Sequence, residues 1–263
     1  MKADIVLDKS YLEGAPASSI RELCAQWRVI MPGALFFEHL TTQDPIGQRS
    51  FARLPQTTNP VAMVEHVGLL LRFEKNRKRP AIPLYERRRY ITYRFSEKLG
   101  QGTFTPTRGQ QAGIAQWQAE IRSGVNNFRA RVADTHAWFP EIAEATNKER
   151  PATIRRYQER LARDPKAVRF IYTRIRPRYA PKPAAITERW AWFRWLQVEL
   201  IAVLDHIQRY GVGSTLATAR DLDNEVIDLQ YRVMAALTGA FATRGKRNIE
   251  TFQLVQPHGT LIS

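Results

Sequence analysis

The sequence has a single cysteine and no long apolar run. With only Cys24 in 263 residues, the chain has neither a disulfide framework nor a thiolate metal site, which fits a reducing cytoplasm. The apolar run near the N-terminus, Ile5 to Leu7, is too short for a signal peptide, and no later run reaches the length of a membrane span. These absences predict a cytoplasmic protein that is neither exported nor embedded in a membrane.

Acidic residues are scarce relative to basic ones, with 25 Asp and Glu against 40 Lys and Arg. The resulting net charge of +15 and isoelectric point near 10.3 favour a polyanionic partner such as RNA or DNA over an acidic small molecule. Attraction to an anionic membrane or plain solubility explains such a charge equally well. The length suits one large domain, or one domain that carries a sizeable insertion.

The first forty residues have the pattern of a βαβα unit. Ile5 to Leu7 predict a strand buried on both faces of a parallel sheet, with Asp8 at its carboxyl end. Residues 19–27 carry apolar side chains at helical period, which predicts a crossover helix. Residues 29–31 predict a second strand, after which Pro32 opens a helix that contains Glu38.

The C-terminal part predicts two long helices followed by a strand, a helix and a strand. Apolar residues recur with helical period over residues 186–210, and a further helical stretch runs from Ala217 to about Leu237. Residues 240–243 predict a strand, residues 249–254 a short helix, and residues 260–262 a last strand. This part therefore closes with αβαβ.

The middle of the chain, from residue 43 to residue 185, is basic, interrupted by prolines and without a run of βα units. It predicts a mostly helical insertion, with helices over residues 110–132, 151–161 and 165–175 and a strand-like stretch from Tyr90 to Phe95. Prolines between residues 177 and 183 make a stiff linker, so a boundary near Ala185 is expected. Residues 1–42 and 186–263 then form one discontinuous α/β domain with a central, mainly parallel sheet.

Three acidic residues from remote parts of the chain are placed to meet at one edge of this sheet. Open α/β sheets gather their functional groups at the carboxyl ends of the strands, near the switch in strand order. Asp8 ends the first strand, Glu38 lies in the helix after the second strand, and Asp228 lies in the helix before the strand at residue 240. Each of them alone is more typical of a turn, an exposed helix face or a helix terminus.

The stretches around these acids resemble the PIN-like nuclease family. Ile5 to Ser10 resembles its opening strand, in which an apolar run is followed by Asp and, two residues on, by Ser, Thr or Asn. Residues 29–38 resemble its second strand and the helix that bears a Glu. Asp228 to Ala235 resembles its third acidic motif, and Ala240 to Arg244 the apolar strand and Thr-Arg pair that follow. The match covers about 1 to 42 and 214 to 263.

The resemblance implies a three-layer α/β/α domain that hydrolyses phosphodiester bonds with Mg²⁺ or Mn²⁺, and it favours RNA over DNA. Asp8 and Asp228 would bind the metal, and Glu38 would bind metal or position the attacking water. Ser10 would orient Asp8 or a phosphate, and Thr243 and Arg244 would serve a similar orienting role. Magnesium prefers oxygen ligands and keeps several waters, so a few carboxylates and a substrate phosphate complete its shell.

One position departs from the family pattern. The family usually has Asp or Asn directly after the Thr-Arg pair, where this chain has Gly245. The missing acid can be supplied by Asp221, Asp223 or Glu225, of which Glu225 lies three residues before Asp228 and can share its helical face. Asn248 is an alternative, as a neutral oxygen ligand.

Basic clusters interleaved with aromatic residues predict a nucleic-acid surface in the insertion. Aromatic rings can stack on unpaired bases while lysine and arginine neutralise phosphates, although such clusters can also be solvated faces. The candidate residues are Lys75, Arg77, Lys78, Arg79, Arg87, Arg88, Arg89, Arg155, Arg156, Arg174 and Arg176. Two alternatives to a nuclease stay open: a catalytically inactive nucleic-acid-binding protein, which Gly245 favours, and an adaptor whose basic middle docks a partner or inhibitor protein.

Overall fold

The computed structural model describes residues 2–41, 50–57, 59–81, 105–211 and 218–263. Within them a five-stranded sheet has the order β3-β2-β1-β4-β5, and every neighbouring pair is parallel. The strands are β1 (Asp4–Leu7), β2 (Arg28–Pro32), β3 (Ala62–Val64), β4 (Ala240–Ala242) and β5 (Thr260–Ile262). The predicted α/β class with a parallel sheet is confirmed.

The central strand β1 is short, and after Asp4 at its start it is apolar, because helices cover both faces of the sheet. Ile5, Val6 and Leu7 are all inaccessible to solvent, as expected for a strand in a parallel sheet. Val6 pairs with Ile30 of β2 on one side and with Phe241 of β4 on the other. From β1 the chain moves outward to β2 and β3, then returns past β1 to β4 and β5, so the strand order switches between β1 and β4.

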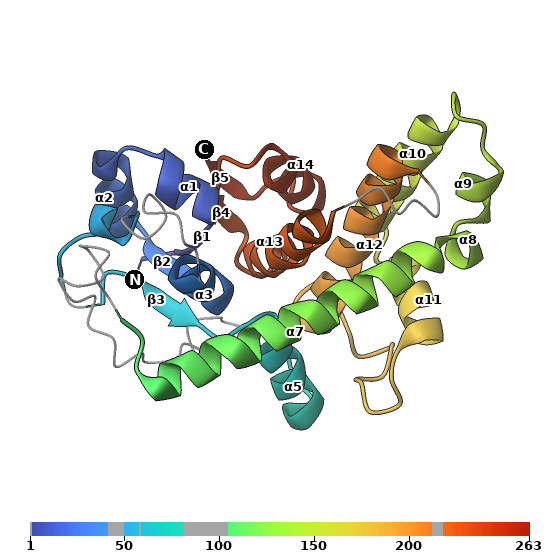
Figure 1. The fold of residues 1–263 in the computed structure, drawn as a ribbon. Helices are drawn as coiled ribbons and strands as arrows, with labels where there is room; N and C mark the ends of the chain where they lie inside the picture. The colour runs from blue at the N-terminus through green and yellow to red at the C-terminus, as the bar shows by residue number, and fades with distance from the viewer. Residues whose placement is uncertain (1, 42–49, 58, 82–104, 212–217) are drawn as a thin grey trace.

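Helices surround the sheet and continue into a wholly helical part of the chain (Figure 1). Around the sheet lie α1 (Lys9–Gly14), α2 (Ala17–Gln26), α3 (Gly33–Thr41), η1 (Ser50–Arg53), α13 (Ala219–Thr238) and α14 (Lys246–Val255), while α5 (Val67–Arg77) follows β3 and packs against α13. The remaining helices are α7 (Arg108–Ala133), α8 (Thr135–Trp138), α9 (Pro140–Glu144), α10 (Arg150–Arg163), α11 (Pro165–Ile175) and α12 (Ala191–Tyr210).

Helix α13 is the main cover of one sheet face, packing along β1, β2 and β4, while α2 packs on β2 from the other side (Figure 1). The start of α13 is fixed by a capping box, in which the Thr218 hydroxyl accepts from the Asp221 N–H and the Asp221 carboxylate accepts from the Thr218 N–H. At its end, Gly239 adopts φ +77°, a conformation that favours glycine and turns the chain directly into β4.

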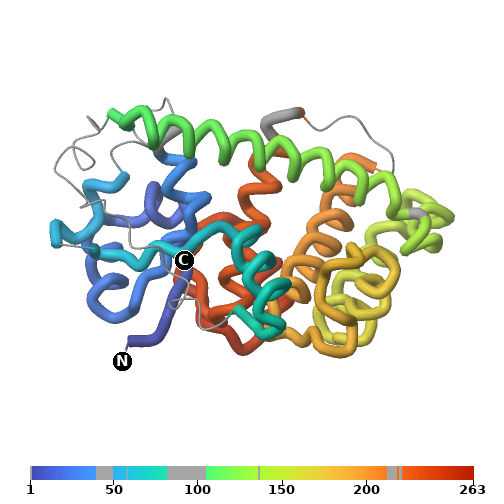
Figure 2. Tube along the Cα trace, turned by 90° about the horizontal axis from the view of Figure 1, so that it is seen from below, coloured from blue at the N-terminus to red at the C-terminus, as the bar shows by residue number. Residues whose placement is uncertain are grey.

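The long helix α7 connects the sheet to the helical part (Figures 1 and 2). It packs against α3 and α13 at the sheet and against α12 and α8 further along. Near its start the Trp117 ring stacks on Phe37 of α3, with ring centroids 5.8 Å apart. Its C-terminal end leads into α8, and α10 and α11 pack beside α12.

Most predicted elements occur close to their expected bounds, and the helix expected over residues 249–254 begins earlier, at Lys246; other differences are larger in consequence. The second strand continues to Pro32, so α3 begins at Gly33 and not at the proline. The helix expected over residues 186–210 begins at Ala191. The predicted insertion began at residue 43, but β3 at residues 62–64 pairs with β2, so the sheet draws on this range too. The strand-like stretch at residues 90–95 lies outside the described residues.

In the part of the chain that the structure describes, none of the helices combines the length and the apolar character needed to cross a bilayer.

Candidate functional site

Asp8 lies at the switch in strand order, directly after β1. Its N–H donates to the carbonyl of Ala242 at 3.0 Å, which fixes it against β4, and only 2% of the residue is exposed. Its Oδ2 atom accepts from Ser10 Oγ at 2.7 Å, from the Thr243 hydroxyl, and from Asn248 Nδ2 at 3.1 Å. No hydrogen-bond donor among the described residues reaches its other oxygen, Oδ1. Asp8 therefore carries a buried carboxylate oxygen that lacks a partner there.

Asp228, on α13, shares a hydrogen-bond donor with Asp8. Asn248 Nδ2 lies 3.1 Å from Asp8 Oδ2 and 3.4 Å from Asp228 Oδ1, so the two carboxylate oxygens are within about 6.5 Å, the sum of these distances. Arg232 Nε donates to Asn248 Oδ1 at 2.6 Å. Because a guanidinium can only donate, this contact turns the amide NH₂ toward both acids. Asn248 is thus a donor to them, not the oxygen ligand that the sequence suggested as one alternative.

The protonation of Asp228 is shifted by these surroundings. Burial raises the pKa of Asp228 to about 6, Arg232 at 3.3 Å opposes the shift, and the nearby Asp8 carboxylate adds to it. A like charge at short range disfavours ionisation, which is the expected effect of two carboxylates at one site. Burial is the larger cause of the shift, and the Asp8 carboxylate adds to it.

Glu38 reaches the same edge of the sheet from α3 and is bound by two donors. Lys9 Nζ donates to its Oε1 at 2.9 Å, and the Tyr231 hydroxyl donates to its Oε2 at 2.7 Å. Burial raises the pKa of Tyr231 well above its ordinary value, and the charges of Glu38, Asp8 and Asp228 raise it further. The Tyr231 hydroxyl thus lies in the field of all three predicted acids and stays protonated.

Glu225 is held by three arginines. Arg232 Nη1 lies 2.6 Å from its Oε1, while Arg209 Nη2 and Arg247 Nη1 each lie 3.0 Å from its Oε2. Burial alone would raise the pKa of Glu225, but the arginines, with Arg232 foremost, hold it below its ordinary value. Glu225 is therefore a buried counter-ion of three arginines, of which Arg232 is itself buried. Of these four residues, only Glu225 was a candidate from the sequence.

The other predicted site residues fall into two groups. Ser10 and Thr243 lie beside Asp8, and the Arg244 N–H donates to Ser10 Oγ at 2.9 Å. Asp221 is exposed and occupied in the cap of α13. Asp223 lies five residues before Asp228 on α13, so the two side chains leave the helix about 140° apart and do not share a face.

Gly245 stands at the N-cap of α14 with ordinary extended backbone angles, φ −72° and ψ 113°. A Cβ built there would lie 3.4 Å from Asn248 Nδ2 and 3.6 Å from the Thr243 hydroxyl, which are normal contact distances. The backbone and the space at this position therefore allow a side chain, and one placed there would face the Asp8 site.

The carboxylates are not assembled as a complete metal cage. Among the described residues, no group of three or more His, Cys, Asp or Glu side chains is placed to hold a metal ion together. Magnesium, however, is often held by one or two carboxylates with waters and substrate phosphates completing its shell. Oδ1 of Asp8, which no donor of the described residues reaches, and the Asp228 carboxylate have the oxygen-ligand chemistry for that smaller requirement.

The predicted basic residues within the described ranges are mostly exposed, and several stack on aromatic rings. Lys75 Nζ lies 4.3 Å from the Tyr179 ring centroid, and the Arg174 guanidinium lies 4.0 Å from that of Phe170. Arg77, Lys78 and Arg79 lie exposed at the end of α5 and just beyond it, and Arg176 is half-buried after α11. Arg155 and Arg156 form surface ion pairs on α10. Arg87, Arg88 and Arg89 lie outside the described residues.

Comparison with protein-family models, with curated proteins and with solved structures found no match for this chain.

Proposed function

We propose that the chain is a metal-dependent nuclease with a PIN-like α/β/α core, and that RNA is its preferred substrate. One observation carries the proposal. Asp8 and Asp228, from opposite ends of the sequence, share one amide donor at the switch in strand order, and the buried Oδ1 of Asp8 has no donor among the described residues. Ligands of open α/β sheets bind at such a switch point.

In this proposal Asp8 and Asp228 would hold Mg²⁺ or Mn²⁺. A bound divalent ion would supply an activated water and neutralise charge on the scissile phosphate. Ser10, Thr243 and Asn248 hold Oδ2 of Asp8, which leaves Oδ1 as its ligand atom. Arg232 fixes the orientation of Asn248 and contacts Asp228, so it is a positioning residue for both acids.

Glu38 and Lys9 would act on the substrate side of the same edge. The Glu38 side chain is 16% exposed and that of Lys9 is 25% exposed, so both are within reach of solvent. Glu38 would orient the attacking water, and Lys9 would exchange its contact with Glu38 for a phosphate oxygen when the substrate binds. Tyr231 keeps Glu38 in place through its hydrogen bond.

Paired measurements of metal binding and cleavage test the proposal. We expect wild-type protein to bind Mn²⁺ in calorimetry and to cut labelled RNA faster than DNA in Mg²⁺ or Mn²⁺. Asp8→Asn and Asp228→Asn should each lower the cleavage rate at least 100-fold, while Asp134→Asn, an exposed acid at the end of α7, should leave it unchanged. Cleavage by Asp8→Asn at the wild-type rate would refute the assigned role.

A second candidate is a nucleic-acid-binding protein without catalytic activity. It is favoured by the ion pair between Lys9 and Glu38 at 2.9 Å, which occupies the third predicted acid, and by Gly245 in place of an acid. This candidate predicts salt-dependent RNA binding with no cleavage and no Mn²⁺ binding. The same experiment therefore separates the two.

A further inference from the structure

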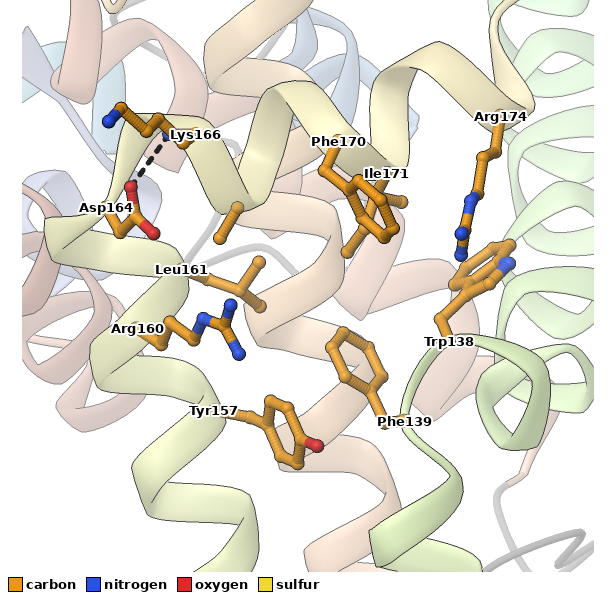
Figure 3. A pocket seen from close by; sticks show the side chains of 11 residues that line it. Trp138, Phe139, Tyr157, Arg160, Leu161, Asp164, Lys166, Phe170, Ile171 and Arg174 are labelled. Atoms are coloured by element: carbon orange, nitrogen blue, oxygen red, sulfur yellow. Dashed lines mark hydrogen bonds between the residues drawn. The ribbon is translucent and has the colours of Figure 1, made fainter.

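A pocket of about 450 Å³ lies in the helical part, among α8, α10 and α11. Four aromatic side chains line it: Trp138, Phe139, Tyr157 and Phe170 (Figure 3). Phe139 and Tyr157 pack against each other with ring centroids 4.9 Å apart, while Phe170 extends over the hollow from α11. A volume of this size is within the range of small-molecule and nucleotide sites.

The rim of the pocket is cationic. Arg160, Lys166 and Arg174 line it together with one acid, Asp164. Asp164 is already occupied, since its Oδ1 accepts the Lys166 N–H at 2.9 Å as the N-cap of α11. The acid therefore serves the helix, and the three cations give the rim an excess of positive charge.

Phe170 is the most unusual residue of the pocket. It is 57% exposed, and Phe170 and Tyr179 are the large apolar side chains that the described part of the chain leaves exposed. The Arg174 guanidinium lies 4.0 Å from the Phe170 ring centroid (Figure 3), a contact that is weak at an exposed position. More than half of the Phe170 residue is therefore open to solvent where it borders the pocket.

We propose that this pocket binds an unpaired base of single-stranded nucleic acid, with the flanking phosphates on Arg160, Lys166 and Arg174. The base would stack on Phe170, and Arg174 would turn from the ring to a phosphate. Every base, whatever its identity, can stack on an aromatic side chain. The phosphates of the strand supply the negative charge that complements the cationic rim. An acidic peptide matches the rim but supplies no regular series of flat faces.

This inference rests on the proposed function for the identity of the polymer, and it adds a substrate class. Figure 1 places α10 and α11 at the end of the molecule away from β1 and α3. The pocket would therefore hold the strand at a distance from the predicted acids. Such a site selects unpaired segments, because a base inside a duplex presents no free face to Phe170.

The test measures binding in the presence of a chelator, in the Asp8→Asn background, so that cleavage plays no part in it. A fluorescein-labelled single-stranded RNA is compared by anisotropy with the same strand made abasic over its central segment. We expect Phe170→Ala to weaken binding of the intact strand about 5- to 150-fold and to leave the abasic strand unchanged. Phe170→Trp should restore the difference, and Tyr179→Ala, the matched exposed ring, should preserve it.

The cations are tested separately by salt. Arg174→Ala should lower the slope of log affinity against log salt by about 0.7 for both strands, because one phosphate contact is lost. Equal affinity of wild type for the intact and abasic strands would overturn the proposal. Competition gives a second such result. The proposal would also be overturned if a free mononucleotide or an acidic peptide displaced the labelled RNA at a concentration at which an unlabelled RNA strand did not. Binding that passes these tests while wild type cuts nothing would support the pocket and reject the nuclease.

Discussion

Arg232 offers the sharpest test of the buried charges around the candidate site. Its side chain is 2% exposed and contacts Glu225 at 2.6 Å, Asn248 at 2.6 Å and Asp228 at 3.3 Å. Removing one partner of a buried ion pair costs about 3–5 kcal/mol, because the other charge stays buried. Glu225 keeps Arg209 and Arg247, which lowers the cost, whereas Asn248 loses its only described donor and adds about 1–3 kcal/mol.

We therefore expect Arg232→Met to lower the free energy of unfolding by about 4 kcal/mol, measured by urea denaturation monitored by circular dichroism. The matched controls are Arg209→Met and Arg247→Met, which remove contacts to the same carboxylate. Their side chains are 27% and 49% exposed, so each should cost at most about 1 kcal/mol.

The comparison among these arginine variants shows whether the buried Arg232 stabilises the cluster of Glu225 and its three arginines more than its two exposed neighbours do. If Arg232→Met costs no more than Arg247→Met, the cluster is not held together from its buried side, and Arg232 does not position Asn248. Arg232→Lys should fall between, since an ammonium keeps the charge but cannot serve three separate acceptors from one rigid fork.

Three further predictions concern single positions. The pKa of Asp228 is raised to about 6, so the folded state binds more protons than the unfolded state between about pH 4 and 6. The free energy of unfolding should therefore fall as pH rises through that window, and Asp228→Asn should abolish this fall. An unchanged pH profile of the variant in urea denaturation would contradict the prediction. Gly245→Asp should strengthen Mn²⁺ binding in calorimetry at least tenfold, because the new side chain would face the Asp8 site; unchanged affinity would show that the carboxylate does not reach the ion. Glu74 accepts three backbone N–H groups, from Ala81 and from Ala191 and Trp192 at the start of α12. Glu74→Gln turns an NH₂ group toward one of these donors, so it should lower the free energy of unfolding by about 1–3 kcal/mol in thermal unfolding. A neutral effect would mean that the start of α12 does not depend on this carboxylate.

The sheet could be predicted from local patterns because its strands are short, apolar and followed by clear helix signals. β1, β4 and β5 occur where the sequence predicts them. β3 was not predicted from the sequence, because its three residues, Ala62 to Val64, are too few to show a periodicity and their burial depends on pairing with β2. The prolines around them are part of the pattern that assigned this range to the insertion, although β3 pairs with β2 in the sheet.

The sequence indicated the acids of the candidate site and the hydroxyl residues Ser10 and Thr243 that lie beside Asp8, but not its cations. Asp8, Glu38 and Asp228 stand at ends of strands or on flanking helices, so topology alone brings them to one edge. The cations that contact two of these acids, Lys9 at Glu38 and Arg232 at Asp228, give weaker signals in the sequence. The spacing of Asp228 and Arg232 is that of a helical ion pair, but such pairs are usually exposed, and only tertiary packing buries this one.

If the protein cuts a strand that it also holds in the aromatic pocket, as we propose, the distance between the predicted acids and the pocket sets a minimum length for that strand. On α7, Trp117 stacks on Phe37, the neighbour of Glu38, and Ala133 ends the helix just before α8, which carries Trp138. Sixteen residues of helix separate these points, about 24 Å at 1.5 Å per residue. A stacked strand advances about 3.4 Å per nucleotide, so about seven nucleotides would reach from one site to the other. Cleavage efficiency, measured as kcat/KM on strands of increasing length, should therefore rise steeply near that length in wild type and stay flat in Phe170→Ala. A rise of the same size in both proteins would mean that the pocket does not hold the strand that is cut.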